Sequence, residues 1–206
     1  MATRGRSSWC SAARIAGGVA GVAVAVDSAR RARQRRVGPV EARVFRRFND
    51  RSDRFVVPTW LVMQSGSLGA VFVASAEVAR RGSVRRGVRV GVVGSTVWIG
   101  TKAVKPLVRR GRPDEYLDGV VVRGARQRGL GYPSGHAAVA LTLALTIPAA
   151  LGRAPGAGAR LAAAAGVAAT GAARMYVGAH LPLDIVGGYA LGAGAGIVGS
   201  ALLRRT

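Results

Sequence analysis

Aromatic residues are scarce in this chain of 206 residues: Phe, Trp and Tyr make up 5% of it, although 50% of the residues are hydrophobic. The hydrophobic residues are mostly Ala, Val and Leu, and Gly is also abundant. A soluble domain of this length ordinarily carries more Phe, Tyr and Ile in its core. The mean hydropathy is positive. Together these features indicate a membrane protein of one domain.

Acidic residues and cysteine are also few. The chain has 9 acidic and 31 basic residues, which gives a net charge of +22. The cations are clustered between uncharged runs, as in loops that contact anionic lipid headgroups. Zinc-ligand spacing, aromatic-rich motifs and a helix-turn-helix pattern are all lacking, so no nucleic-acid partner is expected. Cys10 has no second cysteine to pair with. The carboxylates show no metal-ligand spacing, and no metal is predicted.

Long apolar segments recur along the chain at regular intervals. Each is about long enough to cross a hydrocarbon core ~30 Å thick at about 1.5 Å per residue. The sequence therefore predicts an all-α fold, a polytopic membrane bundle of five to six transmembrane helices. The predicted spans are residues 58–76, 88–106, 135–152, 161–177 and 185–203, with a weaker segment at residues 15–26.

Two units are predicted from this pattern. Residues 1–39 form a basic N-terminal region that contains the weak segment, and residues 40–206 form the membrane domain. Within the second unit, residues 40–48 alternate apolar and charged positions at helical spacing, which fits an interfacial amphipathic helix or a solvated basic linker. Glycines recur every four residues at positions 188, 192 and 196. This spacing predicts close helix packing, unless it only reflects the abundance of glycine.

The chain contains two histidines, His136 and His180, and each stands at the start of an apolar segment. Ionisable groups at membrane depth are costly and mark functional sites. Pro133 disfavours helix before it, Ser134 is a good N-cap, and Gly135 lets a ligand approach the backbone. The helix that follows offers an anion site at its N-terminus, where His136 can donate a proton. The alternative is an ordinary helix start, because Pro-Ser-Gly also begins many helices that bind nothing.

The second histidine belongs to a cluster with Asp184 and Arg174. His180 and Asp184 are four residues apart, so they lie on one face of a helix or of its first turn. Asp184 can then accept the imidazole N–H and stabilise the cation that forms on attack. Pro182 fits the first turn of the next helix, and Arg174 supplies a planar cation for phosphate oxygens. The alternative is a loop histidine beside a helix-capping Asp.

Three motifs in this order resemble the signature of the type 2 phosphatidic acid phosphatase superfamily, K-x6-R-P, P-S-G-H and S-R-x5-H-x3-D. In this chain they read Lys105-x6-Arg112-Pro113, Pro133-Ser134-Gly135-His136 and Arg174-x5-His180-x3-Asp184. Taken alone, Lys105 and Arg112 would be ordinary interface anchors. The departure is Ala173, where the family often has serine. The resemblance covers roughly residues 40–203.

This resemblance implies an integral membrane lipid phosphatase that uses no metal and no cofactor. His180 is the implied nucleophile and forms a phosphohistidine, Asp184 orients it, and His136 protonates the leaving group and then activates water. The implied phosphate-binding groups are Lys105, Arg112, Arg174 and the N–H groups near Ser134 and Gly135. Vanadate is the implied inhibitor.

Several functional questions stay open at this level. The partners are a lipid phosphate and membrane lipids, and the substrate can be a polyprenyl phosphate or diphosphate, a polyprenyl phosphosugar phosphate, phosphatidic acid or phosphatidylglycerol phosphate. A phosphotransferase of the same superfamily uses the same intermediate. A haloperoxidase shares the anion pocket, but those relatives are larger and soluble. The non-enzymatic alternative is a basic membrane scaffold without activity. The oligomeric state is open.

The location expected is the cell membrane, with several crossings. Counting crossings places all three motifs on one membrane face. Relatives carry their site on the extracytoplasmic side, whereas the distribution of arginines leans towards a cytoplasmic site by the positive-inside rule. We follow the resemblance and predict an extracytoplasmic site.

Overall fold

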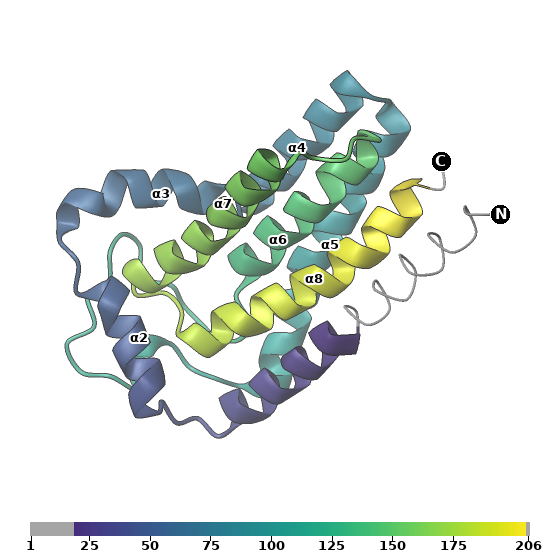
Figure 1. Cartoon of the computed structure of the whole chain (residues 1–206). Coiled ribbons are helices and arrows are strands. Elements are labelled where there is room, and N and C mark those ends of the chain that lie inside the picture. Colours follow the sequence, from purple (N-terminus) through teal and green to yellow (C-terminus); the bar gives the residue numbers. More distant parts are fainter. Residues whose placement is uncertain (1–18, 205–206) are drawn as a thin grey trace.

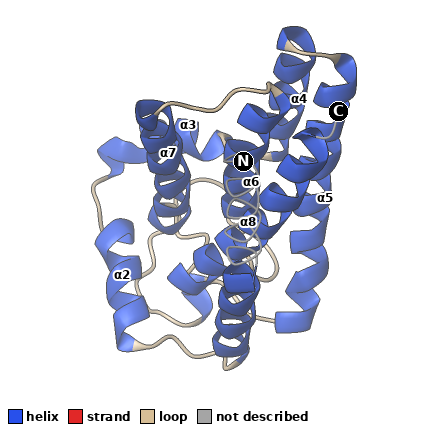
Figure 2. Ribbon diagram, turned by 45° about the vertical axis from the view of Figure 1, so that its right-hand side comes forward, coloured by secondary structure: helices blue, strands red, loops and turns tan. Residues whose placement is uncertain are grey.

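The computed structural model describes residues 19–204 and folds them into α-helices joined by loops (Figures 1 and 2). No β-strand occurs within this range, and the predicted all-α bundle is confirmed. The first described element is helical over residues 19–33. The helices that follow are α2 (Pro39–Asn49), α3 (Val56–Gln64), α4 (Leu68–Arg81), α5 (Val84–Val108), α6 (Gly135–Ala150), α7 (Ala157–Tyr176) and α8 (Pro182–Arg204), with short 3-10 turns η1 (Asp53–Phe55) and η2 (Pro113–Glu115).

Length and hydropathy together single out α8 among the described helices as able to cross a membrane, with 23 residues. The bent pair formed by α3 and α4 is a second candidate if the two helices count as one broken span. α6 is apolar but shorter. The predicted number of five to six spans therefore stays a prediction. Of the weak segment at 15–26, residues 15–18 lie outside the described range, as does Cys10.

The segment 58–76, predicted as one continuous helix, is instead broken between α3 and α4, which meet at 51°. The hydroxyl of Ser67 accepts the Ala70 N–H at 3.1 Å and so starts a new helix. Gly66 lies in the break against the backbone of His136, where any larger side chain would overlap it. The break is therefore required by contact with the start of α6, which an uninterrupted apolar run does not reveal.

α8 packs closely on α6 through its glycines. A Cβ atom at Gly188 would lie 2.5 Å from the carbonyl oxygen of Ser134, and one at Gly196 would lie 2.6 Å from the Leu145 side chain. Gly192 faces the backbone of Ala138 equally closely. The predicted small-residue packing is confirmed, because the two helices approach at distances that only glycine permits.

α2 covers the whole of the segment 40–48 that has amphipathic spacing. Phe45 is fully buried and packs in one cluster with Leu181 and Ile185 at the start of α8. Asn49, at the end of α2, donates to the carbonyl of Tyr176 at 3.1 Å and so ties α2 to the end of α7. The helix is confirmed, while its position relative to a membrane surface stays a prediction.

The end of α7 and the start of α8 lie near α2 at one end of the bundle (Figure 1). The start of α6 and the long segment after α5 reach the same end, because both hydrogen-bond to residues of the α7–α8 turn and of α8. The motif residues are therefore carried by helix ends and loops that converge, although they are far apart in the sequence.

Candidate active site

His180 and Asp184 form a buried pair at the start of α8. His180 lies in the turn after α7 and is 3% exposed, and Asp184 lies in the first turn of α8 and is fully buried. Nδ1 of His180 is 3.4 Å from Oδ2 of Asp184, which is within ion-pair distance but longer than an ordinary N–H···O hydrogen bond of about 2.7–3.2 Å. The same oxygen accepts the Leu181 N–H at 2.9 Å. Asp184 therefore caps the start of α8 and also faces the imidazole of His180. The two interpretations of this carboxylate, a helix-capping Asp and a partner of His180, are both compatible with the structure.

Arg112 lies against the imidazole. Its Nη1 atom is 3.3 Å from Nε2 of His180 and donates to the carbonyl of Ala179 at 2.6 Å. Its Nε–H donates to the Gly129 carbonyl at 3.0 Å, which fixes the side chain from both ends. Burial, and then the cations Arg174 and Arg112, hold the pKa of His180 well below its usual value. The imidazole is therefore neutral at neutral pH, as a nucleophile must be.

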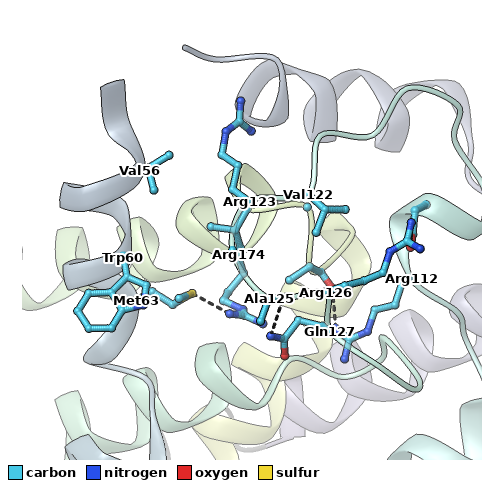
Figure 3. Close-up of a pocket in the computed structure, with 15 residues that line it drawn as sticks. Val56, Trp60, Met63, Arg112, Val122, Arg123, Ala125, Arg126, Gln127 and Arg174 are labelled. Carbon is cyan, nitrogen blue, oxygen red and sulfur yellow. Dashed lines mark hydrogen bonds and ion pairs between the residues drawn. The ribbon is translucent and has the colours of Figure 1, made fainter. Parts of the chain in front are cut away.

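Arg174, in the last turn of α7, is 3% exposed. Its Nη1 donates to the sulfur of Met63 at 2.7 Å, and its buried Nε has no hydrogen-bond partner among the described residues. Figure 3 shows Arg174 beside Met63, with Arg112 across the same pocket. A buried guanidinium that holds only a weak sulfur acceptor retains donors for an anion.

The pocket that contains these two arginines has a volume of about 190 Å³. One wall is apolar and comes from α3, through Val56, Trp60 and Met63. Residues 122–127 line another part of the pocket and contribute the polar side chains Arg123, Arg126 and Gln127. A site with one apolar wall and a cationic interior suits a ligand that joins an anionic group to an apolar chain.

Lys105 does not stand free in the site. Its ammonium donates to the carbonyl oxygens of Leu130, Gly131 and Pro133 at 2.7, 3.1 and 3.2 Å. An ammonium has three donors, so all three are engaged with the loop that leads into α6. Lys105 therefore shapes this loop, and direct contact of its ammonium with phosphate stays a prediction.

Ser134 is the N-cap of α6, as predicted from the sequence. Its hydroxyl accepts the Ala137 N–H at 3.5 Å, and its own N–H donates to the carbonyl of Asp184 at 2.9 Å. Gly135 fits where a Cβ would lie 3.2 Å from Thr101 Oγ1. The ring of His136 meets Trp98 edge-on, with centroids 5.6 Å apart. The Ser134 amide is thus occupied, which leaves the N–H groups of the next residues to face a ligand.

Two residues next to the site were not anticipated. Arg110 is fully buried, donates to Glu41 at 2.9 and 2.7 Å, and lies 3.3 Å from Oδ1 of Asp184. By sequence, Arg110 belongs to a basic loop and Glu41 to the amphipathic segment 40–48. The available signal was that Glu41 is the one acidic residue of an otherwise basic helix.

Metal-binding groups are not assembled in the described part of the chain. Within residues 19–204, no set of three or more His, Cys, Asp or Glu side chains lies close enough together to hold a metal ion. The absence of a metal requirement stays a prediction, because it concerns the reaction and needs an assay.

Comparison with known proteins places these residues in a family. The family model of the PAP2 superfamily matches residues 88–205, which is more than half of the chain and includes all the predicted site residues. No curated protein sequence matches the chain.

Two solved structures share its fold. One is the first transmembrane PAP2 type phosphatidylglycerolphosphate phosphatase from Bacillus subtilis, with TM-score 0.68 and 15% identity over 92% of this chain and 94% of that one. The other is Aquifex aeolicus LpxE, with TM-score 0.67 and 21% identity over 79% of this chain and 95% of that one. At these identities the likeness establishes the fold alone. With the family match, it leads to the conclusion that this chain belongs to the PAP2 superfamily.

Proposed function

We propose that this protein is an integral membrane lipid phosphatase that hydrolyses a phosphomonoester or diphosphate of a lipid through a phosphohistidine on His180. The observation that carries the proposal is the buried pair of His180 and Asp184, 3.4 Å apart, with Arg112 3.3 Å from the other imidazole nitrogen. A neutral imidazole between a carboxylate and a guanidinium is suited to attack an anionic phosphorus centre.

The first chemical step is in-line displacement at phosphorus. Asp184 holds the proton on Nδ1, so the lone pair on Nε2 of His180 attacks phosphorus and forms the N–P bond. At the same time the bond to the leaving oxygen breaks, which is the lipid alcohol oxygen of a phosphomonoester or the bridging oxygen of a diphosphate. His136 donates a proton to the leaving oxygen. In the second step His136 accepts a proton from water, the water oxygen attacks phosphorus, and the N–P bond breaks to release phosphate and restore His180.

Charge stabilisation comes from fixed cations. Arg112 and Arg174 are the groups we assign to the equatorial phosphoryl oxygens, because both are buried, line one pocket and act on the charge of His180. The N–H groups at the start of α6, around Gly135, supply further donors. Lys105 contributes by holding the loop before α6 and by its charge. We propose that these groups take the place of a metal ion.

The pocket next to the candidate site supports a lipid phosphate as the substrate. Val56, Trp60 and Met63 form an apolar wall next to the arginines, so a phosphate joined to a hydrocarbon chain can place its chain along α3. Polyprenyl phosphates or diphosphates, phosphatidic acid and phosphatidylglycerol phosphate all have this form. We propose a multi-pass protein of the cell membrane with its site on the extracytoplasmic side.

The test is phosphate release from a panel of lipid phosphates by the purified protein in detergent. We expect turnover by the wild type and none by His180→Ala, with both proteins showing the same thermal unfolding. Added alcohol acceptors separate hydrolysis from transfer, because a phosphotransferase would convert the alcohol into its phosphate ester. Turnover retained in His180→Ala would exclude the phosphohistidine route.

A further inference from the structure

A chain of charged groups extends from the back of the candidate nucleophile to α2. Arg110 is completely buried and lies between two carboxylates. Its Nη1 and Nη2 atoms donate to Oε1 and Oε2 of Glu41 at 2.9 and 2.7 Å, and Nη1 also lies 3.3 Å from Oδ1 of Asp184. Glu41 is 69 residues from Arg110 in the sequence and belongs to a different helix. Glu41 and Arg110 are called the back pair below.

Stability alone does not account for the back pair. Removing charges from water costs free energy that their mutual attraction only about offsets, and well-packed apolar residues often replace buried ion pairs without loss. The Nε of Arg110 is also buried with no hydrogen-bond partner among the described residues, which adds to the cost. An ion pair whose arginine is fully buried, lacks a partner for Nε and lies next to a candidate catalytic carboxylate points to a role in the site.

The contacts of Asp184 show what the back pair does. Oδ1 faces Arg110, whereas Oδ2 faces Nδ1 of His180 and accepts the Leu181 N–H. Each carboxylate oxygen thus has its own partners, and rotation of the carboxyl group would break contacts on both sides. Arg110 therefore orients Oδ2 towards the imidazole.

Glu41 limits how Arg110 can bind. A guanidinium presents its donors in a rigid fork that favours bidentate pairing with a carboxylate. Glu41 takes that bidentate position and leaves Asp184 a single, longer contact. Without Glu41, the guanidinium of Arg110 is free to turn towards Asp184 and to compete with His180 for the carboxylate oxygens of Asp184. Glu41 also accepts the Leu183 N–H at 3.0 Å, which ties it to the turn that carries Asp184.

α2 supports this arrangement mechanically. Phe45, one turn after Glu41, is fully buried in the cluster that contains Leu181 and Ile185. The helix that supplies Glu41 therefore packs directly on the residues that flank Asp184. Its position is set by apolar packing that does not involve the charges themselves.

We propose that Glu41 and Arg110 are positioning residues that fix the carboxylate of Asp184 and, through it, the tautomer and orientation of His180. The inference rests on the proposed function, in which His180 is the nucleophile. Neither residue touches the phosphate. Their loss lowers the rate of phosphorylation of His180 and leaves substrate binding intact.

Kinetics of matched variants test the proposal. Arg110→Met and Glu41→Gln keep side-chain size and remove one charge each, and Arg110→Lys keeps the charge without the fork. We expect kcat per active site, titrated by phosphoenzyme formation, to fall by about tenfold to a hundredfold in Arg110→Met, with KM unchanged. Arg110→Lys should recover part of the loss, and the double variant should lose no more than Arg110→Met alone.

The matched control is Asn49→Ala. Asn49 is a fully buried polar residue of α2 whose side-chain hydrogen bonds go to Val121, Met175 and Tyr176, and not to Asp184 or His180. It should lower the unfolding temperature and leave kcat per active site unchanged. If Arg110→Met does not fold, Glu41→Gln and Arg110→Lys decide the question. Unchanged kcat in these variants, or an equal change in KM, overturns the proposal.

A spectroscopic readout separates this proposal from the function on which it rests. The chain has 2 histidines, so ¹⁵N-labelled imidazoles can be assigned with His136→Gln. We expect His180 to be protonated on Nδ1 in the wild type and in Asn49→Ala, and to become a mixture of tautomers in Arg110→Met. If the wild type hydrolyses no lipid phosphate, the proposed function fails while this measurement still decides the positioning. A His180 tautomer insensitive to Arg110 overturns the proposal.

Discussion

The backbone N–H of Ser134 donates to the backbone carbonyl of Asp184 at 2.9 Å, so the starts of α6 and α8 are joined directly. This bond connects the motif that holds His136 to the motif that holds His180 and Asp184. The two helix starts can approach this closely because Gly188, in the next turn of α8, has no side chain to collide with the Ser134 carbonyl. The geometry of the candidate site therefore depends on helix packing as well as on its own side chains.

Packing at Gly192 is predicted to be essential for the site. A methyl group there would overlap the backbone of Ala138 in α6. Gly192→Ala should therefore lower the free energy of unfolding by about 1–3 kcal/mol, as overpacking does, and reduce activity. Thermal unfolding and phosphate release in detergent measure both effects.

Gly194→Ala is the matched control, since a Cβ at Gly194 has no atom within 4 Å. The same substitution should there be neutral or stabilise by up to ~1 kcal/mol, because alanine favours helix over glycine. Equal behaviour of the two variants would contradict close packing of α8 on α6.

The proposed nucleophile pair predicts a graded set of activities. Asp184→Asn should lower kcat by roughly 10⁴-fold, because the amide cannot stabilise the imidazolium and favours the wrong tautomer. His136→Ala should slow both steps and allow phosphoenzyme to accumulate when a substrate with a good leaving group is used. Single-turnover assays with radiolabelled phosphate detect the phosphoenzyme. Finding the label on a residue other than His180 would refute the assignment.

The low pKa of His180 predicts a stability that depends on pH. The pKa of His180 in the folded protein lies well below its unfolded value of about 6.5. Below pH ~6.5 the unfolded chain therefore binds a proton that the folded protein does not, so stability falls as pH falls. Above that pH, His180 is neutral in both states and the contribution is fully present.

Thermal unfolding of the wild type and of His180→Asn between about pH 4.5 and 8 checks this linkage. The loss of stability on acidification should be smaller in the variant, because its side chain does not titrate. Parallel curves for the two proteins would show that the pKa of His180 is not lowered by folding.

The charge-stabilised mechanism predicts that activity survives EDTA and is blocked by vanadate. Vanadate readily becomes five-coordinate, so bonded to His180 it resembles the transferring phosphoryl group, and such mimics bind far more tightly than substrates. A metal-dependent phosphatase would lose activity on chelation. Phosphate release with each reagent added is the measurement. Complete loss in EDTA, restored by magnesium, would rule out the metal-free mechanism.

The side of the membrane can be tested by labelling single cysteines after Cys10→Ser. Asp118→Cys lies at the site end of the bundle, and Arg85→Cys lies in the first turn of α5, away from the candidate site; both positions are exposed. If the site is extracytoplasmic, an impermeant maleimide should label Asp118→Cys in intact cells and Arg85→Cys only after permeabilisation. The reverse pattern would place the site in the cytoplasm, as the arginine distribution suggests.

Features set by neighbouring residues were determined by the sequence alone. Ser134 after Pro133 specified the start of α6, and Pro182 specified the start of α8, because capping and proline geometry act within one turn. The spacing of His180 and Asp184 likewise placed the two groups together, since four residues span about one helical turn. The three motifs together also indicated the family.

Features that depend on contacts between distant segments were decided by the tertiary structure. The break between α3 and α4 exists because Gly66 lies against His136, and the partners of Lys105 are loop carbonyls about 25 residues away. By sequence, Glu41 and Arg110 belong to two separate basic segments; packing of α2 on α8 brings them together behind Asp184, with Arg110 fully buried and the Glu41 side chain 10% exposed. Local patterns encode helix ends and faces, whereas which buried charges meet depends on how complete helices pack.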